Sequence, residues 1–358
     1  MAIFKYLFPL LPYMRRKTRL IKIGSRKIGG SFPVLVQSMC NTDTKDVAAT
    51  VGQIHKLEEA GCDIVRVAVP DMDSAKALKE IKRQAGIPVV ADIHFDYRLA
   101  VESAKYADKI RINPGNIGSE EKIKKIVEAC REYGVPIRVG VNSGSLKKKI
   151  AADDGNTARA LFESAKEYAG LFGKFNFHNL VFSLKSSDVK EMIEANRLFS
   201  KHFDYPLHLG VTEAGPYNVG VIKSAVGIGT LLLDGIGDTI RVSLTENPVE
   251  EVFAGIEILK SLGLRKGRIF ISCPTCARTS VNLIKIAHEI EKLTRDDNKQ
   301  TTLAVMGCEV NGPGEAKHAD LGVACAKGVG YIFRKGKIIR KVEEKDIVRD
   351  FLEEYNKF

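Results

Sequence analysis

The sequence predicts an α/β protein in two parts, an N-terminal (β/α)8 TIM barrel and a small C-terminal α/β domain. The main observation is that β-rich runs alternate with amphipathic helical stretches eight times between Val34 and Gly263. This alternation implies a parallel sheet, and eight units in roughly 250 residues match the usual size of the barrel. In addition, no Gly-x-Gly-x-x-Gly turn follows the first run, which argues against a doubly wound sheet.

The β-rich runs and their boundaries define the expected domains. The predicted strands are Val34–Met39, Asp63–Val69, Pro88–His94, Lys109–Asn113, Pro136–Asn142, Leu180–Lys185, Pro206–Thr212 and Thr239–Leu244. Several intervening helices end at a glycine suited to a C-cap, namely Gly61, Gly134 and Gly263. The rhythm then stops and shorter elements follow, including a basic hairpin that turns at Lys335-Gly336. We expect an extension over residues 1–14, a barrel over 15–264 and a C-terminal domain over 265–358.

The composition and the cysteine pattern indicate the cellular compartment of the protein. The chain has 358 residues, of which 44% are hydrophobic and 28% charged, as in globular proteins. Its seven cysteines are odd in number and widely spread, which favours a reducing cytoplasm over a disulfide scaffold. The apolar run from Ile3 to Met14 is too short to span a membrane and lacks the architecture of a secretory signal. We therefore expect a cytoplasmic protein that does not associate with membranes.

Charged and polar residues recur at the C-terminal ends of the predicted strands. Five strands contribute a cation there: Arg66, Arg111, Arg138, Lys185 and Arg241. One such arginine is more often part of a structural ion pair than a ligand-binding group. Five converging cations, with only Asp92 and Glu213 as nearby acids, favour an anion site because crowded like charges in a low-dielectric mouth are costly. Two or more phosphoryl groups would suit these side chains, since arginine binds phosphate oxygens bidentately.

Other polar side chains share these strand ends. They are Asp92, His94, Asn113, Asn142, His208, Glu213 and Ser243. Each histidine is as suited to orienting a neighbour as to donating a proton. The net charge of +11 is compatible with an anionic small molecule or with nucleic acid. No stripe of basic residues interleaved with aromatics is present, which argues against an RNA-binding protein with a zinc ribbon.

A cysteine constellation dominates the C-terminal domain. Cys273 and Cys276 form a Cys-x-x-Cys pair, and Cys308 follows a separate predicted strand. These thiolates suit either an iron–sulfur cluster or a structural zinc ion. A Pro/Gly turn after Cys308 ends in Glu315, whose carboxylate could provide an exchangeable fourth ligand of a catalytic cluster. In the zinc alternative the fourth ligand would be Cys325 or His318, and the enzyme would be a redox-silent barrel acting on phosphorylated or pterin-like substrates.

Longer segments resemble one known family. The most specific are Ala91-Asp-Ile-His94, Leu207-His-Leu-Gly-Val-Thr-Glu-Ala-Gly215, Cys273-Pro-Thr-Cys276 and Met306-Gly-Cys-Glu-Val-Asn-Gly-Pro-Gly-Glu315. Through these, the chain resembles the bacterial 4-hydroxy-3-methylbut-2-en-1-yl diphosphate synthases of the non-mevalonate (MEP) isoprenoid pathway. The resemblance extends from about Arg15 to Val342, whereas the extension over Met1–Tyr13 has no recognised counterpart.

The resemblance implies a reaction and a cofactor. Members reductively open 2-C-methyl-D-erythritol 2,4-cyclodiphosphate to 4-hydroxy-3-methylbut-2-enyl diphosphate and water, using two electrons from ferredoxin or flavodoxin. A [4Fe-4S] cluster in the C-terminal domain would be held by Cys273, Cys276, Cys308 and Glu315. The resemblance also implies a head-to-tail homodimer, in which the cluster domain of one subunit covers the barrel mouth of the other.

These implications assign provisional roles to the strand-end residues. Four cations, Arg66, Arg111, Arg138 and Lys185, are expected to clamp the diphosphate, and Glu213 to deliver a proton to the departing hydroxyl. The residues expected to orient substrate oxygens are Asn142, Arg241, Ser243 and Asn311. The remaining expected substrate-binding residues are Asp92, His94, Asn113 and His208.

Overall fold

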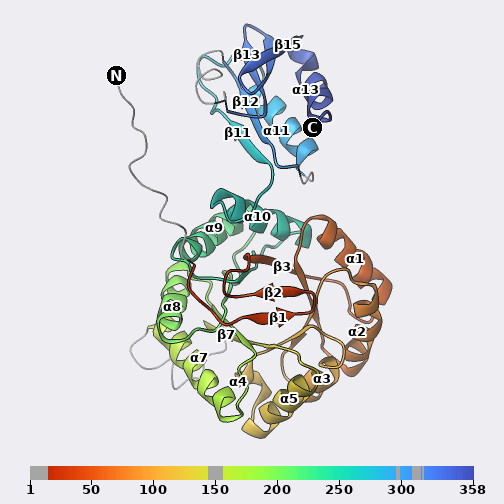
Figure 1. The fold of residues 1–358 in the computed structure, drawn as a ribbon, viewed down its shortest axis with the longest axis vertical. Helices are drawn as coiled ribbons and strands as arrows, with labels where there is room; N and C mark the ends of the chain where they lie inside the picture. Colours follow the sequence, from red (N-terminus) through yellow and green to blue (C-terminus); the bar gives the residue numbers. More distant parts are fainter. Residues whose placement is uncertain (1–14, 144–155, 296–298, 309–315, 317) are drawn as a thin grey trace. The chain divides into compact units, whose positions relative to one another are not determined.

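The computed structural model describes residues 15–143, 156–295, 299–308, 316 and 318–358. The chain divides into two compact units, Met1–Arg265 and Lys266–Phe358. Figure 1 shows the first as a ring of helices around strands and the second as a smaller sheet with helices. Among the described helices, none is both long and apolar enough to cross a membrane.

The first unit contains the predicted barrel. Its strands are β3 (Leu35–Met39), β4 (Ile64–Ala68), β5 (Val89–Ile93), β6 (Lys109–Ile112), β7 (Ile137–Asn142), β8 (Leu180–Lys185), β9 (His208–Leu209) and β10 (Thr239–Ile240). They pair in parallel in the order β8-β7-β6-β5-β4-β3-β10-β9. A parallel bridge between Phe182 and Leu207 joins β8 to β9 and closes the ring. The fold class predicted from the sequence is confirmed.

The last two barrel strands are shorter than predicted. We expected Pro206–Thr212 and Thr239–Leu244, but the regular ladder covers only β9 and β10. Beyond β9, the space that a side chain at Gly210 would need is taken by the Arg241 carbonyl oxygen and the Lys185 amine, which lie 2.5 and 2.7 Å from an ideal Cβ. The backbone is still held there, since Arg241 N–H donates to the Leu209 carbonyl at 3.0 Å.

Helices surround the barrel on its outer side (Figure 1). They are α1 (Val47–Glu59), α2 (Met72–Gln84), α3 (Tyr97–Ser103), α4 (Pro114–Ile117), α5 (Glu120–Glu132), α7 (Thr157–Lys174), α8 (Val189–His202), α9 (Tyr217–Leu233) and α10 (Pro248–Ser261). Many begin at an Asp or Asn whose side chain accepts a backbone N–H, as Asp46 does for α1 and Asp188 for α8. The predicted C-cap glycines Gly61, Gly134 and Gly263 have φ of 90°, 69° and 69°, a conformation that favours glycine.

A hairpin that we did not predict seals the N-terminal end of the barrel. Strands β1 (Ile21–Ile23) and β2 (Arg26–Ile28) pair in antiparallel fashion and lie across the barrel in Figure 1. The apolar residues that pack together here are Ile21, Ile23 and Ile28 of the hairpin with Leu35, Ile64, Val90 and Val181 of the barrel strands. This end of the barrel is therefore filled by apolar side chains.

The second unit is built on one mixed sheet. Its strands, in spatial order, are β11 (Ile269–Ser272), β12 (Thr302–Met306), β13 (Leu321–Ala326), β14 (Val329–Arg334) and β15 (Lys337–Glu343). The first three are parallel, and β14 and β15 are antiparallel to their neighbours. Helices α11 (Leu283–Thr294) and α13 (Ile347–Tyr355) contribute to its apolar core.

The local predictions for the second unit largely hold. The basic hairpin turns at Lys335 and Gly336, whose φ values of 48° and 77° suit a tight two-residue hairpin turn. After β15, Glu344–Asp346 form a 3-10 turn and α13 begins at Ile347.

Candidate active site

The barrel interior carries the predicted cations. Successive side chains of a strand point to opposite faces, so the outward set packs against the helices and the inward set lines the interior. Asp92 on β5 is the cross-strand neighbour of Arg111 on β6, which is the neighbour of Arg138 on β7. On the next strand, Lys185 is opposite Asn142. The sheet register therefore brings Asp92, Arg111 and Arg138 side by side in the barrel interior. Lys185 ends β8 as predicted, but Arg138 is the second residue of β7 and lies deeper than the predicted C-terminal strand end.

Asp92 forms the centre of one buried network. Its Oδ1 accepts a hydrogen bond from Arg111 Nη1 at 2.9 Å, and its Oδ2 lies 3.8 Å from Arg66 Nε. His94 Nε2 is 3.3 Å from Asp92 Oδ2 and 2.9 Å from Arg111 Nη1. Burial alone would raise the pKa of Asp92, but Arg66, the His94 contact and Arg111 together hold it well below its usual range. Asp92 is therefore an ionised partner of two arginines.

Arg66 is buried and has a weak hydrogen-bond acceptor beside it. Its Nε and Nη2 contact the Met39 sulfur at 3.0 and 2.8 Å, so a weak acceptor takes two of its donors. Burial, together with repulsion from Arg241 and Arg111, lowers the pKa of Arg66 to about 10, although Asp92 opposes the shift. The side chain remains a cation at neutral pH, but burying its charge lowers the stability of the folded protein.

Arg138 and Lys185 are buried next to other cations. Arg138 is 1% exposed and Lys185 is 8% exposed, and within the described residues neither forms an ion pair with a carboxylate. Arg138 Nε and Nη1, as well as Arg111 Nε, have no hydrogen-bond partner there. Burial lowers the pKa of Arg138 and of Lys185 well below the ordinary values, and the neighbouring cations add to both shifts. These unused donors are suited to an incoming anion.

Arg241 differs from the other cations because it has a buried acid of its own. Glu251 of α10 is 4% exposed and accepts from Arg241 Nε and Nη2, both at 3.1 Å. It also accepts from Ser38 Oγ at 3.1 Å and from Leu244 N–H at 3.0 Å. Our expectation that only Asp92 and Glu213 lie near the cations is wrong. Glu251 lies on a helix rather than a strand end, so strand-end patterns could not reveal it.

A deeper layer of polar groups was also missed. Lys109, with an exposed fraction of 0%, donates to Gln37 Oε1 at 3.3 Å, and burial lowers its pKa well below the ordinary value. Predicted His208 is also fully buried, with Nδ1 2.8 Å from Thr239 Oγ1 and Nε2 without a partner among the described residues. Burial and then Arg138 lower the His208 pKa well below 6.5, so the ring is neutral. Lys109 lies two residues before Arg111, a spacing that signals a shared face.

The remaining predicted residues occupy different settings. Asn113 is 4% exposed, and its side-chain oxygen accepts from Gly115 N–H at 3.2 Å, as the N-cap of α4. Glu213 is exposed and has a φ of 51°, in the left-handed region. Asn142 and Ser243 are partly exposed at the strand ends. Asn311 and Glu315 lie outside the described residues.

Two glycines make space for the cations. An ideal Cβ at Gly140 would lie 3.0 Å from Arg111 Nε and 3.1 Å from its Nη2. At Gly210 it would lie 2.7 Å from Lys185 Nζ. Larger residues at these positions would displace the two cationic side chains.

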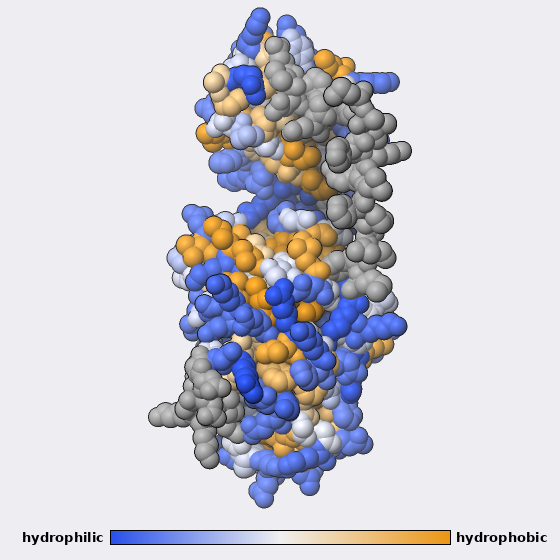
Figure 2. Space-filling model, turned by 90° about the vertical axis from the view of Figure 1, so that its left-hand side faces the viewer, coloured by the Kyte–Doolittle hydropathy of each residue, from blue (hydrophilic) through white to orange (hydrophobic). Residues whose placement is uncertain are grey.

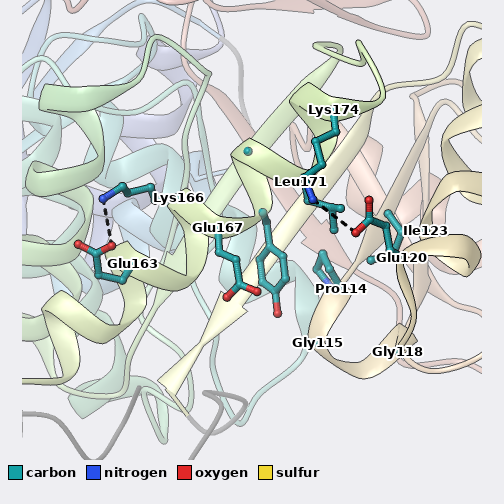
Figure 3. A pocket seen from close by; sticks show the side chains of 12 residues that line it. Pro114, Gly115, Gly118, Glu120, Ile123, Glu163, Lys166, Glu167, Leu171 and Lys174 are labelled. Carbon is teal, nitrogen blue, oxygen red and sulfur yellow. Dashed lines mark hydrogen bonds and ion pairs between the residues drawn. The ribbon is translucent and has the colours of Figure 1, made fainter. Parts of the chain in front are cut away.

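A surface groove of about 590 Å³ lies elsewhere on the barrel, among α4, α5 and α7 (Figure 3). Its charged side chains pair with one another, with Lys174 Nζ 3.6 Å from Glu120 and Lys166 Nζ 3.2 Å from Glu163. None of the strand-end cations lines this groove. Its charges are satisfied locally, and we place the candidate site in the barrel interior instead.

Cysteines of the second unit lie at the edge of its sheet that is formed by the C-terminal ends of β11 and β12. Strands β11 and β12 are parallel with Ser272 opposite Val305, so Cys273 and Cys308 follow neighbouring strand ends. The Gly307 N–H donates to Cys273 Sγ at 3.1 Å, and Ser280 N–H donates to the Gly307 carbonyl at 3.3 Å. The Cys-x-x-Cys loop is thereby tied to the segment that carries Cys308.

The thiols of Cys273, Cys276 and Cys308 suit a metal or iron–sulfur centre, and the structure bears on which residues could complete it. Among the described residues, no three His, Cys, Asp or Glu side chains form a closed metal-binding group. Cys276 is exposed and Cys273 is half-buried, so their thiols are accessible from this edge. Cys325 faces the apolar core, and burial raises its thiol pKa to about 12, which disfavours the ligating thiolate. His318 is exposed.

The Glu251–Arg241 pair generates a direct test. Glu251→Asp retains the charge but withdraws the carboxylate by one methylene, so it should disturb the orientation of Arg241 without changing the net charge. We expect the binding free energy of inorganic diphosphate to weaken by about 1.5 kcal/mol, the lower end of the range for a hydrogen bond to a charged group. In an Arg241→Met background the same replacement should have almost no further effect, because the two residues act as one unit. Calorimetric titration of the four proteins measures this coupling. An equal loss in both backgrounds would mean that Glu251 acts through Ser38 and Leu244 instead.

Comparison with known proteins agrees with both units. Residues 18–256 match the GcpE TIM-barrel domain, and residues 269–357 match the GcpE protein C-terminal domain. A protein of Caldanaerobacter subterraneus subsp. tengcongensis is 58% identical over 347 residues, covering 96% of this chain and 98% of the relative. A protein of Clostridium perfringens is 57% identical over 341 residues, covering 94% and 98%. Both relatives are named 4-hydroxy-3-methylbut-2-en-1-yl diphosphate synthase (flavodoxin).

Solved structures support the barrel fold alone. Dihydropteroate synthase from Stenotrophomonas maltophilia superposes with a TM-score of 0.52 at 14% identity, covering 69% of this chain and 97% of that protein. The similarity is too distant to transfer chemistry. The two family matches and the near full-length relatives decide the assignment: the chain belongs to the GcpE family.

Proposed function

We propose that this protein is a 4-hydroxy-3-methylbut-2-en-1-yl diphosphate synthase, which reductively opens 2-C-methyl-D-erythritol 2,4-cyclodiphosphate. The observation that carries the proposal is the pair of buried, uncompensated cations Arg138 and Lys185 in the barrel. A diphosphate would supply the missing negative charge, and the names of the relatives point to the same chemistry. The comparisons favour this reading over a redox-silent barrel with a zinc-stapled domain.

The cations would divide the work of binding. Arg138 Nε and Nη1 and Arg111 Nε have no hydrogen-bond partner among the described residues, and these donors are suited to phosphoryl oxygens. Lys185 adds a compact positive charge, and Arg66 shares Asp92 with Arg111. Arg241, already neutralised by Glu251, would contribute orientation more than net charge. Once a diphosphate binds, the charged forms of all these groups are stabilised.

The remaining polar residues would protonate the substrate, orient its oxygens or hold an arginine in place. Glu213 is exposed just beyond β9, where a bound substrate could reach it, and we propose that it delivers the proton to the departing hydroxyl. Asn142, Ser243 and Asn311 would orient substrate oxygens. Asp92 and His94 would act chiefly by holding Arg111, because both contact its guanidinium.

Cys273, Cys276 and Cys308, together with Glu315, would hold a [4Fe-4S] cluster. The thiol chemistry and the Gly307 amide that donates to Cys273 Sγ support this assignment. When bound, the cluster supplies the two electrons that the ring opening consumes. The physiological donor is proposed to be flavodoxin, as in the names of the relatives, with ferredoxin as the alternative. A cytoplasmic location would keep the thiols reduced, and all seven cysteines are free of disulfides.

We also infer that two copies pair head to tail, so that the cysteine-bearing unit of one serves the barrel of the other. Helix α9 offers a surface for pairing, since Val219, Ile222, Val226 and Leu233 are 51%, 65%, 52% and 66% exposed along one side. Figure 2 shows apolar side chains on this side of the barrel. The spacing of three, four and seven residues is that of a helix–helix seam, and a second copy presents the same seam.

Arg138→Met tests the diphosphate clamp. Loss of two unpaired donors and their charge should weaken binding of the cyclic diphosphate by roughly 1.5–3 kcal/mol. Stability without substrate should be maintained or increase, because the substitution removes an uncompensated buried cation. Anaerobic titration and urea unfolding measure the two effects, with Arg197→Met on the outer face of α8 as the control. Unchanged affinity would remove Arg138 from the binding site.

Cys308→Ala tests the cluster assignment against a matched cysteine of the same unit. After anaerobic purification, Cys308→Ala should lose most of its iron and acid-labile sulfide. Cys325→Ala should keep both, because Cys325 faces the core. Elemental analysis of the two variants and the parent decides the matter. Equal iron in Cys308→Ala, or stoichiometric zinc in the parent, would contradict the assignment.

Ile222→Glu tests the shared site. A charge in the α9 seam should shift the protein to a monomer in sedimentation velocity and reduce turnover severely, while each barrel still binds the cyclic diphosphate. Ile284→Glu, at an equally exposed apolar position of α11, should leave assembly unchanged. A fully active Ile222→Glu monomer would show that each site is built within a single chain.

A further inference from the structure

The β14–β15 hairpin and its flanking turns concentrate positive charge. Between Lys327 and Lys345 the chain has seven Lys and Arg and two Glu, a net charge of +5 out of +11 for the whole protein. Two of these cations are locally neutralised. Arg334 lies 3.4 Å from Glu354, and Arg340 lies 2.7 Å from Glu353.

The lysines of this stretch are not neutralised in the same way. Their side chains are exposed, and within the described part of the chain none of them forms an ion pair. They are Lys327, Lys335, Lys337, Lys341 and Lys345. Unpaired surface lysines in one element create a directional field that attracts an acidic partner.

Apolar side chains lie within this basic region. Ile338 and Ile339 of β15 are 66% and 45% exposed, and β15 is an edge strand paired only with β14. Lysines on an edge strand often serve only to prevent sheet aggregation. Two adjacent exposed isoleucines work against that purpose, whereas an apolar centre with a charged rim is typical of a protein-binding surface.

The sheet topology connects this region to the cysteine edge. Because β13 runs parallel to β12, its C-terminal end and the turn at Lys327 lie at the same edge as Cys308. The turn that carries Lys345 is held there, since Glu344 N–H donates to the Gly328 carbonyl at 3.2 Å and Glu344 Oε1 accepts from Asn282 N–H at 2.7 Å. The basic region thus begins beside the cysteines and extends along β15.

We propose that this basic surface, Lys327, Lys335, Lys337, Lys341 and Lys345 around Ile338 and Ile339, docks the reduced flavodoxin that supplies electrons. The inference rests on the proposed function. The partner must present an acidic face around its flavin, and long-range attraction would speed a weak, transient encounter. In each encounter a flavin hydroquinone is oxidised to the semiquinone and one electron enters this chain. Two encounters therefore supply the two electrons of the ring opening.

Binding of oxidised flavodoxin to the holoenzyme tests the surface without requiring turnover. Lys337→Glu/Lys341→Glu should raise Kd at low salt at least tenfold and flatten the dependence of Kd on salt concentration. Lys166→Glu/Lys174→Glu makes the same charge change on the barrel and should leave Kd within about twofold of the parent. Fluorescence titration of labelled flavodoxin measures both. Unchanged affinity in the hairpin variant, or an equal loss in the barrel variant, overturns the proposal.

Turnover separates this inference from the proposed function. With dithionite and a small viologen as reductant, the hairpin variant should retain the parental rate, because these carriers need no docking surface. With reduced flavodoxin, its rate at subsaturating carrier should fall by at least tenfold. If the parent is inactive with both reductants, the proposed function fails, while the binding titration still decides whether the hairpin docks flavodoxin. Equal losses with both reductants would mean that the hairpin supports catalysis itself, and would overturn the docking role.

Discussion

The barrel interior holds more buried positive charge than its own acids can balance, and the rest of the first unit accommodates this imbalance. Asp92 forms ion pairs with Arg66 and Arg111, and Glu251 forms one with Arg241. In contrast, Arg138, Lys185 and the deeper Lys109 have no carboxylate partner among the described residues. A buried charge without a partner costs several kcal/mol. A protein keeps such groups where a ligand completes them, and a diphosphate has the charge and the oxygen acceptors to do so.

Neighbouring elements shape the surroundings of this charge. The β1–β2 hairpin fills the N-terminal end of the barrel with isoleucines. Gly140 and Gly210 leave room for Arg111 and Lys185 where any side chain would collide with them. The second unit separates its functions in a similar way, since helices cover one apolar core while the cysteines follow the strand ends at an edge. Charge, space and access are thus set by different elements.

The sequence predicted what depends on local pattern. Alternating runs identified the barrel, and polar residues at strand ends identified Arg66, Arg111, Arg138, Lys185 and Arg241, because a strand positions its own side chains. It did not predict Glu251, which reaches Arg241 from a helix through tertiary packing. Nor did it predict the β1–β2 hairpin, whose strands of three residues each are too short to show a period. Lys109 was predictable from the sequence, since it precedes Arg111 by two residues and therefore shares its face of the strand.

The pH dependence of stability, with and without diphosphate, tests the charge imbalance most directly. Burial lowers the folded-state pKa of Lys185 well below 10.5, so in the range below pH 10.5 the unfolded chain binds more protons at this group and its contribution makes stability rise with pH. Urea unfolding across this range should show that rise in the ligand-free protein and a weaker rise in Lys185→Met. Saturating inorganic diphosphate should increase the unfolding free energy and flatten its pH dependence, because the anion restores the charged amine. The same pH dependence with and without diphosphate would contradict the account.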